Sequence, residues 1–204
     1  MNSTPLSFSK AELSALPIEK FAKKIAVPEN EEEVAAAVKH LSRFKLIGFD
    51  TETRPSFRRG VLHQVALIQM ATEEEAYLFR VNGKRFPDEL KKLIENPAVT
   101  KVGLSLKDDF TALRRIGLSR FESFIDLQNL AKQFQIENQA LRGIYGVLFG
   151  KRISKSQQLS NWEAENLSEA QKEYAALDAW ACLRIYLHLM KYGSTRNAIN
   201  KENE

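Results

Sequence analysis

The sequence is poor in the residues that form covalent cross-links and sulfur-rich metal sites. Its 204 residues include one cysteine, Cys182, which excludes an intrachain disulfide and a cysteine-based zinc site. The three histidines, His40, His63 and His188, do not have the spacing of a helical zinc-binding motif. A catalytic metal ion in this protein would therefore be held by oxygen ligands, which Mg²⁺ prefers.

Long hydrophobic runs are also missing, and this excludes a transmembrane helix. The N-terminus, Met1 to Lys10, lacks the apolar centre of a signal peptide, so we expect a cytoplasmic protein that makes no use of a membrane. Hydrophobic residues make up 44% of the chain, an ordinary share for a globular domain with a sizeable core. The formal net charge of +4 favours an anionic partner.

The length of the chain predicts one domain with modest extensions. Residues 1–28 are expected to form an N-terminal extension, residues 29–193 the domain, and residues 194–204 a polar tail that frays. The extension contains one short amphipathic stretch that is suited to pack on the domain, formed by Leu13, Leu16, Ile18 and Phe21.

Hydrophobic periodicity predicts an α/β layered domain with five strands. The first three strands, joined by short polar links, are expected to form an antiparallel meander at Lys45–Thr51, Gln64–Met70 and Ala76–Val81. Two strand–helix units follow, at Val99–Gly103 with Leu106–Ile116 and at Phe121–Ile125 with Leu127–Phe134. Further helices are predicted after the cap Asn30 and at Leu90–Asn96, Leu141–Phe149 and Ser168–Tyr192.

A pair of carboxylates, Asp50 and Glu52, ends the apolar run of the first predicted strand. Residues i and i+2 of a strand point to the same side, so the two acids are expected to face one way and Thr51 the other. Two like charges this close repel each other unless a cation lies between them. The pair indicates a divalent-ion site, although many strand ends carry such a pair by chance.

A third acid, Asp109, lies where the strand that ends at Gly103 turns into a helix. In the first turn of that helix its side chain can face back toward the strand ends. Taken alone, Asp109 is better explained as an acid that the positive end of the helix dipole stabilises.

The final predicted helix carries Tyr174 and Asp178, which are four residues apart and therefore share a face. Small residues around them let the helix approach a neighbouring element closely: Ala175, Ala176, Ala179 and Ala181. An acid in this apolar stretch is costly to bury without a partner, and a metal ion would be such a partner. Taken alone, the segment is more simply explained by an exposed aspartate beside a half-buried tyrosine.

Together the three segments resemble the motifs of the DEDD superfamily of 3′–5′ exonucleases, in the tyrosine-containing subgroup of ribonuclease D and the Werner syndrome exonuclease. Asp50-Thr51-Glu52 matches D-x-E, Asp109 to Leu113 matches D-x-x-x-L, and Tyr174 to Asp178 matches Y-x-x-x-D. Glu173 stands where the histidine subgroup has its histidine. The resemblance covers roughly residues 29 to 192, and the spacing to Leu113 favours Asp109 over its neighbour Asp108 as the second-motif acid.

The resemblance implies a ribonuclease H-like fold, in which a mixed five-stranded sheet of three antiparallel and two parallel strands is flanked by helices. It implies hydrolysis of phosphodiester bonds at single-stranded or frayed 3′ ends of DNA or RNA, with release of nucleoside 5′-monophosphates. Two Mg²⁺ or Mn²⁺ ions would be held by the acids: Asp50 would bridge them, Glu52 and Asp178 would complete one, and Asp109 would support the other. Tyr174 is expected to orient the attacking water, because a phenol is a poor base at neutral pH.

Several polar or aromatic residues near the motifs are candidates for binding the substrate. Phe57 and Arg58 follow the first motif, and base stacking and an exposed turn explain them equally well. Lys107 precedes Asp109, where a phosphate contact and a solvated helix start are both plausible. A basic stretch ahead of the third motif contains Lys151, Arg152, Lys155 and Ser156. Trp162 follows it and could stack on a base, although a packing role is more common for such a tryptophan. Asp126 is best explained as a helix cap, and a position next to a metal ion is the less favoured explanation.

Two other functions are compatible with the same motifs. A non-catalytic nucleic-acid-binding module could keep the fold, although such a module would usually have lost one of the acids. A phosphodiesterase specific for very short oligonucleotides would use the same chemistry on a different substrate. Degradation of a 5′-labelled strand separates the three functions. An exonuclease gives a ladder that shortens from the 3′ end, a binding module gives no products, and the oligonucleotide phosphodiesterase turns over only dinucleotides.

Overall fold

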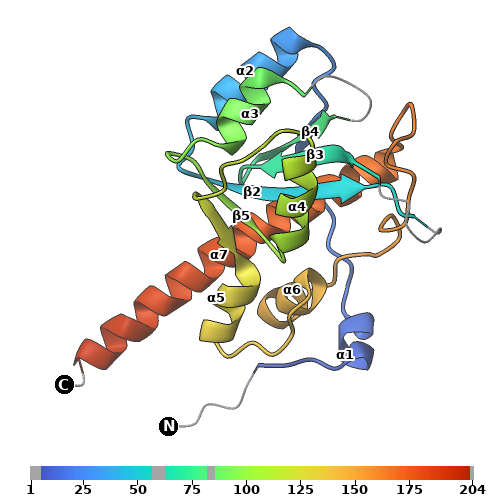
Figure 1. Cartoon of the computed structure of the whole chain (residues 1–204). Coiled ribbons are helices and arrows are strands. Elements are labelled where there is room, and N and C mark those ends of the chain that lie inside the picture. The colour runs from blue at the N-terminus through green and yellow to red at the C-terminus, as the bar shows by residue number, and fades with distance from the viewer. Residues whose placement is uncertain (1–5, 57–62, 82–85, 203–204) are drawn as a thin grey trace.

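In the computed structural model, which describes residues 6–56, 63–81 and 86–202, a six-stranded mixed sheet lies between two layers of helices (Figure 1). The strands are β1 (Lys24–Ala26), β2 (Leu46–Thr53), β3 (Val65–Ala71), β4 (Glu75–Arg80), β5 (Thr100–Gly103) and β6 (Phe124–Asp126). Their order in the sheet is β1-β4-β3-β2-β5-β6. β2, β3 and β4 form the predicted antiparallel meander, while β5 and β6 run parallel to β2. The predicted fold class is therefore confirmed.

The sheet has one strand more than the five that were predicted. β1 lies within the stretch expected to be an extension and pairs in parallel with β4, so that it forms an edge of the sheet. It has three residues and no hydrophobic alternation, which is why periodicity did not reveal it.

The helices are α1 (Lys10–Ala15), α2 (Glu31–Leu41), α3 (Asp88–Ile94), α4 (Lys107–Arg115), α5 (Leu127–Gln133), α6 (Leu141–Phe149) and α7 (Glu169–Glu202). The predicted caps form: Asn30 accepts from Glu33 N, and Ser168 and Gln171 make a reciprocal capping box at the start of α7. The prediction that the last helix ends at Gly193 was wrong. A glycine within a helix costs only about 1 kcal/mol relative to alanine, and no proline follows it to stop the helix.

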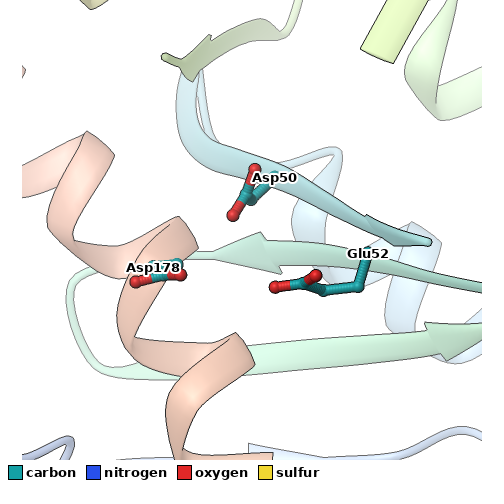
Figure 2. Close-up of side chains that lie close together, drawn as sticks. All are labelled: Asp50, Glu52 and Asp178. Atoms are coloured by element: carbon teal, nitrogen blue, oxygen red, sulfur yellow. The ribbon is translucent and has the colours of Figure 1, made fainter. Parts of the chain in front are cut away.

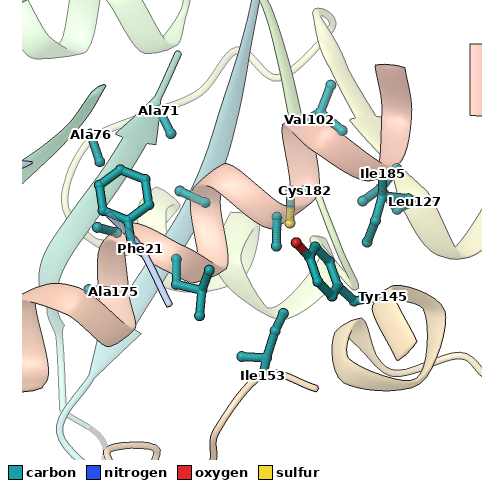
Figure 3. Close-up of a cluster of buried hydrophobic side chains, with 14 of the residues drawn as sticks. Phe21, Ala71, Ala76, Val102, Leu127, Tyr145, Ile153, Ala175, Cys182 and Ile185 are labelled. Carbon is teal, nitrogen blue, oxygen red and sulfur yellow. The ribbon is translucent and has the colours of Figure 1, made fainter. Parts of the chain in front are cut away.

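Two hydrophobic clusters fill the spaces on either side of the sheet. α7 lies along one face of the sheet with α5 and α6 beside it, and Cys182 is buried in this cluster as a packing residue (Figure 3). The second cluster joins the other face to α2, α3 and α4. Along β2, Ile47 and Phe49 face the second cluster, so that alternate residues of the strand face α7.

α7 approaches the sheet most closely at Gly48 of β2. A Cβ atom at this position would lie 2.8 Å from the carbonyl carbon of Ala179 and closer still to its oxygen. The small residues of α7 that the sequence singled out are buried here, among them Ala175, Ala176 and Ala179. Glycine on the strand and alanine on the helix therefore let the two backbones touch, two residues before Asp50.

The N-terminal segment is joined to the domain by a buried acid. Glu19 accepts hydrogen bonds from the Tyr145 hydroxyl (2.7 Å), Lys151 Nζ (3.0 Å) and Arg184 Nη1 (3.1 Å). Phe21, also buried, packs edge-on against Trp180 with ring centroids 5.9 Å apart. These contacts link the segment to α6, to the start of the loop that follows α6, and to α7.

Of the helices in the part of the chain that the structure describes, none is long and apolar enough to cross a membrane.

Candidate active site

The first two acids project from β2, the first strand of the meander, toward α7. Asp50 pairs with Gln69 of β3 and Glu52 with Leu67, so both acids lie inside the ladder. They occupy the same face of β2 as Gly48, which is the face that α7 covers (Figure 2). Thr51 points to the opposite face, as the alternation of a strand predicts.

α7 carries the third acid of the cluster. Asp178 is adjacent to Ala179, where α7 contacts β2, and its side chain is 6% exposed. Tyr174 is one turn earlier on the same face and is half-buried, with its ring centroid 6.0 Å from that of Trp162. The close approach of the two backbones therefore delivers Asp178 to the acids of β2.

The oxygens of these acids converge. Asp50, Glu52 and Asp178 each offer a carboxylate oxygen, and the three oxygens all lie within 4.8 Å of one another. In Figure 2 the carboxylates of Asp50 and Glu52 point toward the helix that carries Asp178. Acids separated by more than a hundred positions in the sequence thus meet at one point between β2 and α7.

Asp109 reaches the same strand from the opposite face of the sheet. It stands in the first turn of α4 and accepts a hydrogen bond from the Thr51 hydroxyl, while Asp108 beside it is exposed. It is not one of the three acids whose oxygens approach within 4.8 Å. Its charge nevertheless contributes to the raised pKa values of Asp50 and Glu52.

The turn that presents Asp109 is held by Asp126. The carboxylate of Asp126 accepts from the backbone N–H groups of Ser105 (3.0 Å) and Leu106 (3.0 Å), and it also caps α5 through Gln128 N (2.9 Å). Ser105 adopts a positive φ of 60°, which is unusual for a residue with a side chain. Asp126 is therefore the helix cap that was predicted, and it also fixes the connection between β5 and α4.

Burial raises the pKa of each acid in this group, and repulsion from the other acids raises it further for Asp50 and Glu52. Burial is the largest cause for Asp50, followed by the charges of Asp178, Asp109 and Glu52, and its pKa lies well above the ordinary value. The pKa of Glu52 rises to about 9 for the same two reasons. Burial raises the pKa of Asp178 to about 7, partly offset by the Tyr174 hydroxyl and the positive charge of Arg142.

The unbalanced negative charge fits a site for divalent cations. Asp178 Oδ1 is buried without a hydrogen-bond partner among the described residues, and so are both polar atoms of the Gln69 side chain. Gln69 is fully buried opposite Asp50 and therefore shares its face of the sheet. Buried carboxylates that lack a partner are expensive unless a cation compensates them, and oxygen-only ligands suit Mg²⁺ or Mn²⁺.

The predicted substrate-binding residues have different environments. Phe57 and Arg58 lie outside the described residues. Lys107, Lys155 and Ser156 are exposed and therefore accessible to a ligand.

Trp162 was a candidate for base stacking, and the structure contradicts that assignment. Its side chain is fully buried in the core, where it packs near Tyr174 as the alternative explanation held. The start of the basic stretch also has a structural role, because Lys151 pairs with Glu19 and Arg152 Nε donates to Leu16 O (3.0 Å). Of this basic stretch, Lys151 and Arg152 therefore make contacts within the protein, whereas Lys155 is exposed.

Sequence motifs did not identify three polar residues next to the acids. Thr51 holds Asp109, Gln69 lies across from Asp50, and Arg142 of α6 acts electrostatically on Asp178. The predicted faces of the strands could have pointed to Thr51 and Gln69. Arg142 carries no local signal, because its proximity to Asp178 depends on how α6 packs against α7.

The fold and this site define a ribonuclease H-like exonuclease domain. The sequence pattern of the 3′–5′ exonuclease family matches residues 25–193, and the chain belongs to this family. It is 36% identical over 172 residues to the bifunctional 3′–5′ exonuclease/ATP-dependent helicase WRN of Mus musculus, covering 80% of this chain and 12% of that protein. It is 33% identical over 153 residues to a 3′–5′ exonuclease of Arabidopsis thaliana, covering 71% and 52%.

A solved structure agrees with these sequence relatives. The EXO domain of Nibbler from Aedes aegypti superposes with a TM-score of 0.76 at 26% identity, over 85% of this chain and 91% of that domain. The chain thus corresponds to nearly the whole of that domain, but to only a part of each of the two longer sequence relatives.

Proposed function

We propose that this chain is a metal-dependent 3′–5′ exonuclease that hydrolyses the terminal phosphodiester bond of a nucleic acid and releases a nucleoside 5′-monophosphate. The convergence of Asp50, Glu52 and Asp178, with Tyr174 on the same helix face as Asp178, is the observation that carries the proposal. Membership of the 3′–5′ exonuclease family supports the polarity of the reaction.

Two Mg²⁺ or Mn²⁺ ions are proposed as the cofactors. Asp50, Glu52 and Asp178 would hold them together with Asp109, which approaches from the other face of β2 through Thr51. When bound, such ions activate a water molecule and offset negative charge on the scissile phosphate and the leaving oxygen. The raised pKa values of the acids imply that ion binding displaces protons from the site.

Tyr174 is proposed to orient the attacking water. Its pKa is raised well above the ordinary phenol value by burial and by the charges of Asp178 and Glu52, so the hydroxyl keeps its proton at any working pH. A permanently protonated phenol cannot act as a general base, but it can donate a hydrogen bond to an oxygen beside Asp178. Replacement by phenylalanine is therefore expected to reduce turnover without abolishing it.

The proposed substrate is a single-stranded or frayed 3′ end. The acids meet between β2 and α7, whose backbones are in contact, so the terminal phosphodiester is proposed to reach them as a single strand. DNA and RNA differ by one hydroxyl, so matched strands of both are the substrates to compare.

The test is degradation of 5′-labelled DNA and RNA strands in Mg²⁺, in Mn²⁺ and in excess chelator. A ladder that shortens from the 3′ end and disappears with chelator is the expected result. Intact strands in every condition would favour a binding module, and turnover of dinucleotides alone would favour an oligonucleotide phosphodiesterase.

Two variants provide a matched pair for the assignment of the second acid. Asp109→Asn removes the carboxylate that Thr51 holds, whereas Asp108→Asn removes an exposed carboxylate one residue away. Activity is expected to fall by at least ~100-fold in the first variant and to change by less than ~3-fold in the second. The reverse result would show that the second-motif acid was placed in the wrong register.

A further inference from the structure

An ionic cluster links two loops beyond the end of β2. Glu163 contacts Arg54 with one carboxylate oxygen (Oε2 to Nη1, 3.2 Å) and His63 with the other (Oε1 to Nδ1, 3.1 Å). Arg54 follows the last residue of β2, and His63 precedes β3, so one acid joins both ends of the β2–β3 connection. In Figure 1 the orange segment before α7, which contains Glu163, runs beside the tip of β2.

The segment that carries Glu163 is fixed by contacts on its other sides. Trp162 is fully buried, and Arg80 donates to the carbonyl oxygens of Ala164 and Glu165. The N–H of Glu163 itself donates to Asn161 Oδ1 (3.2 Å). Glu163 is therefore held in place against Arg54 and His63 by the core of the domain.

Arg54 and His63, the partners of Glu163, also line a hollow beside Asp109. This hollow has a volume of about 380 Å³. Besides Arg54 and His63, its polar lining includes Arg115, the hydroxyls of Thr51 and Thr53, and the two acids Asp108 and Asp109. Arg54 lies only two residues beyond Glu52. Guanidinium, imidazole and hydroxyl groups together are the groups that bind phosphate oxygens in nucleic-acid interfaces.

We infer that Glu163 weakens the binding of nucleic acid: its carboxylate occupies the Arg54 guanidinium and His63 Nδ1, so that a phosphate of the bound strand must compete with it for them. This inference rests on the proposed function, because it assumes a nucleic-acid substrate at the neighbouring acids. A partly exposed ion pair has little net stability, and the side chains of Arg54 and Glu163 are 47% and 28% exposed. A phosphate can therefore displace the carboxylate, and the cost of doing so sets the affinity.

The test compares Glu163→Gln with Glu165→Gln. Both variants remove one negative charge from the same segment, but the Glu165 side chain lines a different hollow with Arg80 and Lys172. Binding of a fluorescently labelled single strand is measured by anisotropy in chelator, so that it does not depend on cleavage. KM and kcat are measured separately in Mg²⁺.

Glu163→Gln is expected to bind the strand about fivefold more tightly and to lower KM similarly with kcat unchanged. Its log Kd should also depend more steeply on log salt, by roughly 0.7, because one further phosphate contact forms. Glu165→Gln should change Kd by less than about twofold. In an Arg54→Gln background, the gain from Glu163→Gln should be mostly lost.

Equal affinities of the two glutamine variants would overturn the inference. So would a lower kcat with unchanged binding, which would show that Glu163 only holds the loops in position. A wild-type protein that binds the strand but never shortens it would instead refute the proposed exonuclease activity, while the comparison of the two variants would still report on Glu163.

Discussion

Gly48 determines how closely α7 can approach β2, and Gly48→Ala tests whether the active site depends on that approach. The added Cβ would lie 2.8 Å from the carbonyl carbon of Ala179 and 3.2 Å from Leu183 Cβ, and closer still to the Ala179 oxygen. Ordinary contacts between carbon atoms are 3.5–4.0 Å, so the helix must move by roughly 1 Å. The carbonyl group of Ala179 belongs to the backbone and Leu183 Cβ is the first side-chain atom, so neither can rotate away from the added methyl group.

The movement has separate consequences for stability and for activity. Overpacking of this kind destabilises a protein by about 1–3 kcal/mol. Asp178 is next to Ala179, so the same movement shifts its carboxylate relative to Asp50 and Glu52. A misplacement of about 1 Å costs on the order of 100-fold in rate, so the loss of activity should exceed what partial unfolding explains.

The assay combines kcat/KM for 3′-end shortening, the affinity for Mn²⁺ and the midpoint of thermal unfolding. Gly146→Ala is the matched control, because its Cβ would meet the mobile ends of the Leu13 and Leu16 side chains rather than backbone. The control should lose some stability and retain activity at a temperature where it is folded. A folded Gly48→Ala protein with activity within about threefold of wild type would refute the reasoning.

Three further predictions concern the charges and amides around the acids. Asp178→Asn should stabilise the metal-free protein by about 4 kcal/mol at pH 8 and by much less at pH 4. Its raised pKa of about 7 means that folding favours the protonated acid, so the penalty is absent below the unfolded value near 3.8 and complete above 7. Urea unfolding at the two pH values checks this prediction. Arg142→Gln should raise the pKa of Asp178 further and so move the acidic limb of the rate profile to higher pH, which a pH–rate series measures. Gln69→Leu should raise the free energy of unfolding of the metal-free protein by about 1 kcal/mol, because both buried polar atoms of Gln69 lack partners in the described part of the chain. The same variant should weaken the binding of Mn²⁺, measured by calorimetry. An unchanged Mn²⁺ affinity would show that the amide of Gln69 takes no part in the metal site.

The sequence was most informative where a local period determines which way a side chain points. The strand period placed Asp50 and Glu52 on one face and Thr51 on the other, and the helix period placed Tyr174 with Asp178. The starts of capped helices were equally predictable from the sequence, because a capping side chain forms its hydrogen bond with a residue two or three positions away. The convergence of the acids was predicted through resemblance to a family and not through any local period.

Features that depend on contacts between distant segments were not predictable in this way. β1 forms by pairing with the edge of β4, and no local period in the sequence indicates that pairing. The contacts of Glu163 span 109 positions to Arg54 and 100 to His63, and neither end carries a recognisable signal. The continuation of α7 beyond Gly193 likewise followed from the lack of a strong stop signal rather than from a motif.

The position of Glu19 matters to anyone who prepares a shorter version of this domain. Cutting before residue 29 would follow the family motifs, but it would remove the shared acceptor of Tyr145, Lys151 and Arg184. The same cut would strip β1 from the sheet and uncover the hydrogen-bonding edge of β4. A bare edge of this kind is a template for pairing with another molecule, so the trimmed protein is expected to aggregate, and recombinant fragments should start upstream of Glu19.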